Sequence, residues 1–228
     1  MYSRSSIASL ALTIAFAMAF ALTVALVSIS SAQLDEKSPT AQSTTQAPTT
    51  EATTTLEPRM LLEFTSNQNG TCALTGIGSC TDATIVIPAY SPAGDRVTSI
   101  SPRALYGCAT VVSIHIPETV AFIGNLAFGD CKNLSFITVS NANLAYRAVD
   151  GVLYSADLSV LILYPARRVG AELFIGAETT AIREMAFFEC THLQRIRYAG
   201  SAAQWEEISV GSKNYALHAL SKEFEAKR

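Results

Sequence analysis

The side chains best suited to chemistry in this 228-residue chain are three histidines and five cysteines. The histidines, His115, His192 and His218, lie far apart in the sequence. A metal site or an activated nucleophile needs several such groups to converge on one point. The sequence also lacks the motifs of a nucleophile elbow, a zinc-binding helix, a phosphate-binding loop and an EF-hand. We therefore expect no catalytic residues, no metal and no cofactor, and predict that the chain is not an enzyme.

The cysteines fall into two groups. Cys108, Cys131 and Cys190 occupy the same position of a sequence repeat, and equivalent positions of stacked coils lie about 5 Å apart, which would permit a disulfide. Their side chains should nevertheless point the same way into the core, so we interpret them as buried apolar fillers. Cys72 and Cys80 flank a glycine-rich segment, and in an oxidising compartment they could form a disulfide.

The repeat itself is the strongest signal in the sequence. One unit begins at Ile114-His115-Ile116-Pro117 and continues with Val120, Ile123, Ala127-Phe128, Cys131 and Leu134. Matching residues occur 23 positions earlier, and again 59 positions later as Leu173-Phe174-Ile175, Ile182, Ala186-Phe187, Cys190 and Leu193. One unit cannot bury its own apolar side, whereas stacked copies bury a continuous core and align their strands. The predicted fold class is a repeat solenoid with a parallel β-sheet on one face and irregular or short helical turns on the other.

Alternate residues of the Ile-x-Ile strands should face outward. They form two rows: Val86, His115, Thr138, Phe174 and Arg197 in one, and Thr84, Ser113, Phe136, Glu172 and Arg195 in the other. Aromatic and arginine side chains are common anchors of protein interfaces. We predict a ligand face made of His115, Phe136, Thr138, Phe174, Arg195 and Arg197. The alternative is that these residues only satisfy strand propensity, or that the terminal segment covers them.

Three segments depart from the repeat. Residues 148–154 and 161–165 read as two strands joined by a polar turn at 155–159. Residues 64–80 contain three glycines among alternating apolar residues, which suits an N-terminal hairpin cap. At the other end, the spacing of Leu217, Leu220 and Phe224 predicts one face of a short C-terminal helix.

The N-terminal segment has the composition of an export signal. Residues 7–29 carry no charge, and a helix of that length measures about 35 Å, enough to cross a bilayer core of about 30 Å. Ser30-Ser31-Ala32 suits cleavage before Gln33. Two alternatives stay open, a cleaved signal peptide and a retained single-pass anchor. Both place the rest of the chain outside the cytoplasm.

These features divide the chain into four regions. Residues 1–32 are the signal peptide or membrane anchor, 33–60 a disordered Thr/Pro-rich stalk, 61–210 the repeat domain with its N-terminal cap, and 211–228 the C-terminal helix or cap. The net charge of −3 gives no electrostatic case for nucleic-acid binding. We expect a monomer that meets a membrane only through residues 1–32, if these are retained.

Residues 114–139, IHIPETVAFIGNLAFGDCKNLSFITV, closely resemble the BspA-type leucine-rich repeat. Residues 70–88, 150–165 and 198–205 are similar to the first segment, the intercalated hairpin and the closing unit of such proteins, so the resemblance covers about 140 residues. It implies a right-handed solenoid in a secreted or surface-attached protein. Several members of the family are adhesins, and no catalytic residues belong to the repeat.

Residues and resemblance together predict an exported, non-catalytic binding module. It would mediate protein–protein or cell-surface adhesion by docking a protein or glycan on its strand face. The alternative is a structural surface or envelope component without a specific ligand.

Overall fold

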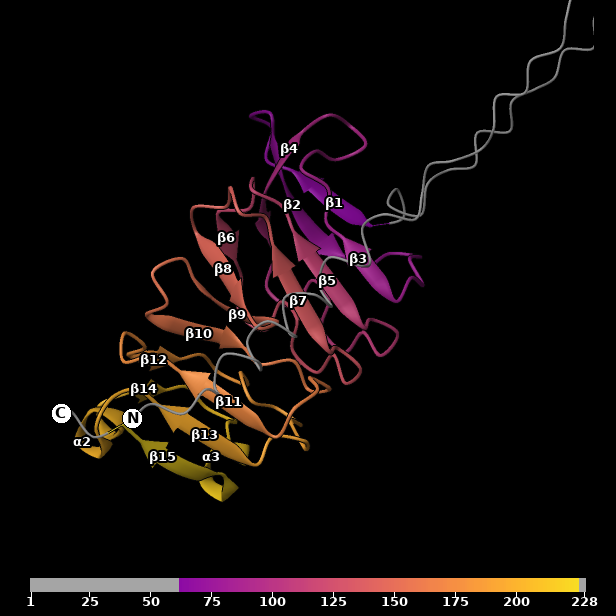
Figure 1. Ribbon diagram of the computed structural model, residues 1–228. Coiled ribbons are helices and arrows are strands. Elements are labelled where there is room, and N and C mark those ends of the chain that lie inside the picture. Colours follow the sequence, from indigo (N-terminus) through magenta and orange to yellow (C-terminus); the bar gives the residue numbers. More distant parts are fainter. Residues whose placement is uncertain (1–61, 226–228) are drawn as a thin grey trace, which may run out of the picture. The chain divides into compact units, whose positions relative to one another are not determined.

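The computed structural model describes residues 62–225, which belong to one unit of the chain. The predicted signal or anchor and the whole of the predicted stalk lie outside the described residues. The described part winds into a β-solenoid whose short strands form four small sheets (Figure 1). Neither of its helices has the length and apolar composition needed to cross a bilayer.

The Ile-x-Ile segments form the two sheets of the predicted strand face. Sheet B contains β3 (Thr84–Val86), β5 (Ser113–Ile116) and β7 (Phe136–Val139), and sheet D contains β11 (Glu172–Ile175), β13 (Arg195–Tyr198) and β15 (Ser221–Phe224). All of these strands are parallel to their neighbours. Ile85, Ile114 and Ile137 stand side by side in sheet B and are buried, as are Leu173 and Ile196 in sheet D. The predicted solenoid with inward-facing apolar columns is confirmed.

The other strands form two further sheets. Sheet A contains β1 (Glu63–Ser66), β2 (Thr71–Gly76), β4 (Arg96–Ile100) and β6 (Phe122–Ile123), and sheet C contains β8 (Tyr146–Val149), β9 (Val152–Ser155), β10 (Val160–Leu163), β12 (Ala181–Ile182) and β14 (Ser209–Val210). β1 and β2 pair antiparallel, so the predicted N-terminal hairpin is confirmed. We number the coils from β3: the first spans residues 84–112, the second 113–135, the third 136–171, the fourth 172–194 and the fifth 195–220.

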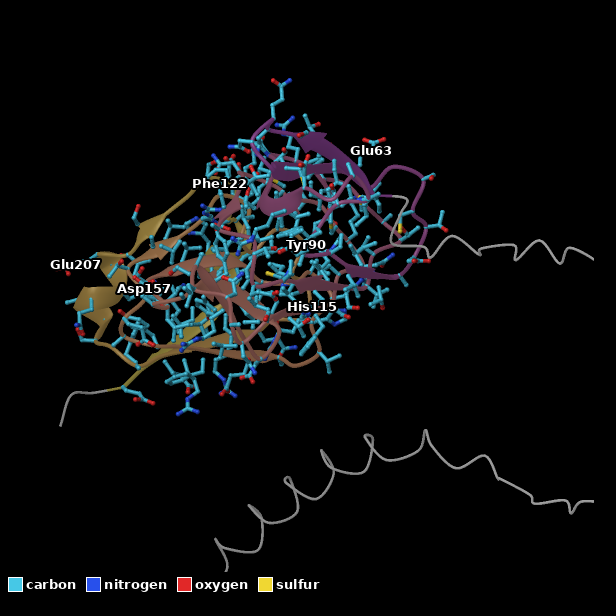
Figure 2. All side chains as sticks on the ribbon, turned by 90° about the horizontal axis from the view of Figure 1, so that it is seen from above. Glu63, Tyr90, His115, Phe122, Asp157 and Glu207 are labelled. Carbon is cyan, nitrogen blue, oxygen red and sulfur yellow. The ribbon has the colours of Figure 1, made fainter. Side chains whose placement is uncertain are left out.

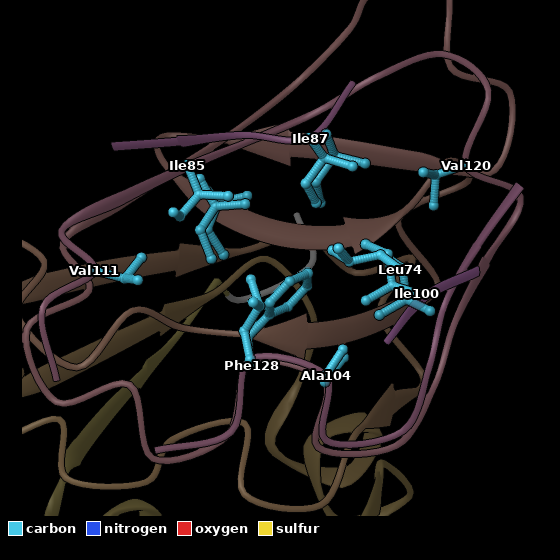
Figure 3. Close-up of a cluster of buried hydrophobic side chains, with 14 of the residues drawn as sticks. Leu74, Ile85, Ile87, Ile100, Ala104, Val111, Val120 and Phe128 are labelled. Carbon is cyan, nitrogen blue, oxygen red and sulfur yellow. The ribbon is translucent and has the colours of Figure 1, made fainter. Parts of the chain in front are cut away.

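One corner of the coils has no regular strand and carries the pairs Ala104-Leu105, Ala127-Phe128 and Ala186-Phe187. There the backbone of the first coil bonds to the second, with Leu105 N donating to Ala127 O at 2.8 Å and Gly107 N to Gly129 O at 2.9 Å. Phe128 and Ala104 project from this corner into the same core as the strand residues (Figure 3). Corner and strands thus bury one another's apolar side chains.

The third coil differs from its prediction. Residues 148–154, expected to form one strand, break at Asp150 and Gly151, whose φ angles are +48° and +80°. Two consecutive residues with positive φ make the tight turn of a hairpin, for which Asp-Gly is a favoured pair. β8 and β9 therefore pair antiparallel across this turn, with Val149 opposite Val152.

The strands β9 and β10 form a wall inside the solenoid. Leu153 and Ile162 pack into a core with the first two coils, whereas Val152, Tyr154 and Leu161 pack into a second core with the last two coils. Because successive side chains of a strand point to opposite sides, each of these strands contributes to both cores. A strand buried on both faces reads as a continuous apolar run, which explains the sequence Val160-Leu161-Ile162-Leu163.

The C-terminal prediction is wrong beyond Ala219. The chain forms α2 (Ala202–Glu206) and a four-residue helix α3 (Ala216–Ala219), but Ser221–Phe224 is the strand β15. Ser221 N donates to Gln194 O at 3.2 Å and Glu225 N to Tyr198 O at 3.0 Å, so the edge of β13 satisfies this backbone. The spacing of Leu220 and Phe224 suits a strand with period two as well as a helix with period 3.6.

Candidate functional site

The outward face of sheet B carries polar side chains held by hydrogen bonds. His115 and Thr138 are neighbours in register, and His115 Nδ1 lies 2.9 Å from Thr138 Oγ1. In the adjacent row, Ser113 Oγ donates to Thr84 Oγ1 at 3.0 Å. His115 is labelled among all side chains in Figure 2. The outward face of sheet B thus presents hydroxyl and imidazole groups whose positions are held by hydrogen bonds.

Phe136 opens the third coil beside these groups. It is 47% exposed, and a Cβ atom added at Gly151 would fall only 2.5 Å from Cδ2 of its ring. The ring therefore lies over the β8–β9 turn. Because Gly151 has no side chain, the ring can lie close to the backbone there and still be about half exposed.

Sheet D carries the remaining predicted ligand residues. Phe174 is 51% exposed. Arg195 pairs with Glu172 and Glu223, each at 2.9 Å, and the bond to Glu223 is the main reason why the pKa of Arg195 is raised. Arg197 lies 3.6 Å from both Glu172 and Glu225. The two guanidinium groups are thus matched by three carboxylates, so this patch does not present unpaired positive charge.

The predicted outward rows do not run continuously across the molecule. β7 and β11 belong to different sheets, and the β8–β9 turn lies between them. Ile137 N donates to Gly151 O at 3.1 Å. On the other side, Arg168 donates to Asp150 O at 2.8 Å and to Glu172 O at 3.3 Å. The row from Thr138 to Phe174 and the row from Phe136 to Glu172 are therefore interrupted by a hairpin tip.

Sequence reasoning missed the residues of this interruption. Arg168 joins the hairpin tip to β11, and Val149 beside the tip is 39% exposed. The Asp150-Gly151 pair was the available signal, because it marks a tight hairpin turn. The structure thus groups Phe136, Val149 and Arg168 around one turn, whereas Phe174, Arg195 and Arg197 lie on sheet D.

The structure contains no bridge between Cys72 and Cys80. Both thiols are free and buried. Cys72 Sγ lies 3.6 Å from Asp95 O in the loop before β4, whereas Cys80 lies beside Cys108, whose pKa it helps to raise. A disulfide between Cys72 and Cys80 therefore remains a prediction from the sequence.

The histidines do not converge on one site. His115 contacts Thr138, and His192 Nε2 lies 3.3 Å from Arg167 Nη1. Across residues 62–225, no three His, Cys, Asp or Glu side chains are grouped so that they could hold a metal ion.

Short parallel strands stacked coil upon coil around apolar columns define a leucine-rich repeat solenoid. A family model described as the BspA type leucine rich repeat region matches residues 87–149 in six copies. Residues 87–149 are therefore a BspA-type leucine-rich repeat region, as the resemblance implied. No curated protein matches the chain.

Solved structures similar to this chain come from bacteria. A leucine rich cell surface protein from Faecalibacterium prausnitzii is 29% identical, with a TM-score of 0.47, covering 63% of this chain and 41% of that one. A leucine-rich repeat protein from Eubacterium ventriosum is 22% identical, with a TM-score of 0.45, covering 58% of this chain and 46% of that one. The matches thus span less than half the length of either protein.

Proposed function

We propose that this protein is an exported, non-catalytic binding module that recognises a protein partner through its outward strand face. The observation that carries the proposal is the pair Phe136 and Phe174, each about half exposed, on rigid strands on either side of the β8–β9 turn. Burying an aromatic ring on a partner releases a large apolar area at a small entropic cost, since few torsions become fixed.

The surroundings of these rings suit a protein interface. The Arg195–Glu172–Arg197 network and the hydrogen-bonded His115 and Thr138 provide polar groups on both sides of the apolar centre. An apolar centre with a polar rim is the usual anatomy of such interfaces. Because the arginines are already paired, we expect affinity to come from the rings and specificity from the polar groups. A glycan stacked on the rings is the other ligand class that this face would suit.

Export is the second part of the proposal. It rests on the uncharged stretch of residues 7–29 and the small residues before Gln33. The Thr/Pro-rich residues 33–60 would then hold the solenoid away from a processing site or a surface. Sequencing the N-terminus of the mature protein tests this part: Gln33 at the N-terminus identifies a cleaved signal, and Met1 on a membrane-bound product identifies an anchor.

The ligand face is tested by comparing Phe174→Ala with the control Phe122→Ala. Phe122 is 56% exposed but lies on β6 of sheet A, away from the proposed face. The wild-type full chain is first screened against arrays of extracellular proteins and of glycans. For a ligand found there, we expect Phe174→Ala to weaken binding at least tenfold, since an aromatic anchor contributes about 2 kcal/mol or more.

Phe122→Ala should bind as the wild type does. Equal affinity of all three proteins, or a loss only in Phe122→Ala, would contradict the proposed face. Binding by the glycan array alone would replace the protein partner with the glycan class while keeping the face.

A further inference from the structure

Cys108 and Cys131 stand side by side in adjacent coils. Leu105 N donates to Ala127 O and Gly107 N to Gly129 O, at 2.8 and 2.9 Å. These two bonds fix the parallel register of the corner, which places Cys108 beside Cys131. Neighbouring parallel segments lie about 4.8 Å apart, which is within the Cα separation of disulfide-bonded cysteines.

The Cys131 side chain is directed toward the coil of Cys108. Cys131 Sγ lies 3.0 Å from Leu105 O, and the Cys108 backbone N–H bonds to the same oxygen at 3.4 Å. The equivalent thiol of the fourth coil is oriented differently, since Cys190 Sγ lies 3.1 Å from Phe187 O of its own coil. The Cys131 thiol therefore points toward the neighbouring coil, although a cysteine at the same repeat position, Cys190, does not.

The two thiols differ in access to solvent. Cys108 is half-buried, whereas Cys131 is 4% exposed. Burial raises the pKa of Cys108, and it raises the pKa of Cys131 to about 12, with a further contribution from the neighbouring Cys108 thiol. An oxidant in solution would therefore meet Cys108 first.

We propose that Cys108 and Cys131 are a redox pair that closes a disulfide between the first and second coils when the chain meets a small-molecule disulfide such as oxidised glutathione. The Cys108 thiolate attacks one glutathione sulfur, forms a mixed disulfide and releases the first glutathione thiolate. The Cys131 thiolate then attacks the Cys108 sulfur and releases the second glutathione. Two protein thiols are oxidised, one glutathione disulfide is reduced to two thiols, and the two protein protons pass to the two glutathiones.

The disulfide would cross-link two adjacent coils of the solenoid. It would add a covalent link between the coils of β3 and β5 at a corner that is otherwise joined only by noncovalent contacts, among them backbone bonds and the bond from Asn133 Nδ2 to Ala109 O at 2.6 Å. A cross-link between residues 23 apart restricts the unfolded chain. The expected rise in the thermal unfolding midpoint is roughly 5–10 °C. This inference does not rest on the proposed ligand face.

The test exposes the full chain to reduced and then to oxidised glutathione, followed by alkylation and peptide mapping by mass spectrometry. We expect the oxidised wild type to lose two hydrogens, with the Cys108 and Cys131 peptides joined. Cys131→Ser should instead retain one glutathione on Cys108, because the resolving thiol is gone. Cys190→Ser, the matched control at the same repeat position, should form the bond as the wild type does.

Two results would overturn the proposal. One is full alkylation of Cys108 and Cys131 after oxidation, and the other is a bond from Cys108 to Cys80, its second neighbouring thiol. Circular dichroism checks that each variant is folded. If Cys131→Ser is not folded, Cys131→Ala provides the same measurement without introducing a buried hydroxyl.

Discussion

At the scale of single residues, the corners of this solenoid depend on unusual backbone angles. The residue before each repeated Ala-Leu or Ala-Phe pair has positive φ, at Arg103, Leu126 and Met185. So does the residue before each repeated cysteine, as Gly107, Asp130 and Glu189 show. Residues with a Cβ atom adopt this conformation at a cost of about 1–2 kcal/mol, whereas glycine does not pay it. The repeat geometry therefore tolerates side chains that local preference disfavours.

Replacing Glu189 by glycine should stabilise the protein. The first coil already has Gly107 at this position, and Glu189 contributes only an exposed ion pair with Lys132 at 3.5 Å, which is worth little. We expect a gain of about 0.5–1 kcal/mol, since part of the released strain is lost to the flexibility of glycine in the unfolded chain. Thermal unfolding measures it.

Glu207→Gly is the matched control. Glu207 has a φ of −83° at the end of α2, so the glycine there relieves no strain. A higher unfolding midpoint in both variants, or in neither, would show that positive φ at residue 189 is not the cause.

At the scale of elements, the connection between β9 and β10 is held by one carboxylate. Asp157 accepts hydrogen bonds from Ser155 Oγ at 2.6 Å, from Ser159 Oγ at 2.8 Å and from Ser159 N at 3.1 Å. These bonds, first that of Ser155, lower the pKa of Asp157 to about 2. The predicted polar turn at 155–159 is thus a local hydrogen-bonded motif that returns the chain for β10.

Asp157 should make this turn sensitive to acid. Its pKa is lowered on folding, so its contribution to stability is present above about pH 4, the ordinary aspartate pKa, and is lost as the pH falls toward 2. The stability difference between wild type and Asp157→Asn should therefore shrink between pH 4 and pH 2. Thermal unfolding across this range measures the difference.

The serines provide the control for this prediction. In Ser155→Ala/Ser159→Ala, the carboxylate loses two donors, so the pKa of Asp157 should rise toward its ordinary value. Carboxyl titration by NMR reads this directly, and an unchanged pKa would contradict the assigned cause.

At the scale of the whole molecule, the wall formed by β9 and β10 separates two cores and also joins them. Leu153 packs with the first two coils, and the adjacent Tyr154 packs with the last two. Arg183 adds a polar link, with Nη1 donating to Ile123 O of the second coil at 3.0 Å. Solenoid stability is a sum of coil and interface contributions, and here one hairpin provides the interface for both halves.

Leu153→Ala should destabilise both cores together. Leu153 is fully buried, and removing its side chain should cost about 2–5 kcal/mol. Trp205, the only tryptophan of the chain, lies in the second core. Its fluorescence midpoint in urea should therefore shift as far as the midpoint of far-UV circular dichroism. A shift in circular dichroism alone would show that the wall does not couple the cores.

Much of the fold of this protein could be predicted from the sequence alone. Fixed offsets of 23 and 59 residues predicted the coils, the inward columns and the outward rows, because a repeat buries its apolar side only against its neighbours. The matched family model agrees with that prediction over residues 87–149.

Tertiary structure determined the outcome where the local sequence pattern suited two structures equally well. Leu220 and Phe224 suit a helix and a strand alike, and only the open edge of β13 selected the strand. The sequence predicted continuous outward rows, whereas in the structure the hairpin tip lies between Phe136 and Phe174. The direction of the Cys131 thiol likewise depends on the carbonyl of Leu105, 26 residues away. Each of these outcomes depends on a neighbouring coil, which no local sequence pattern contains.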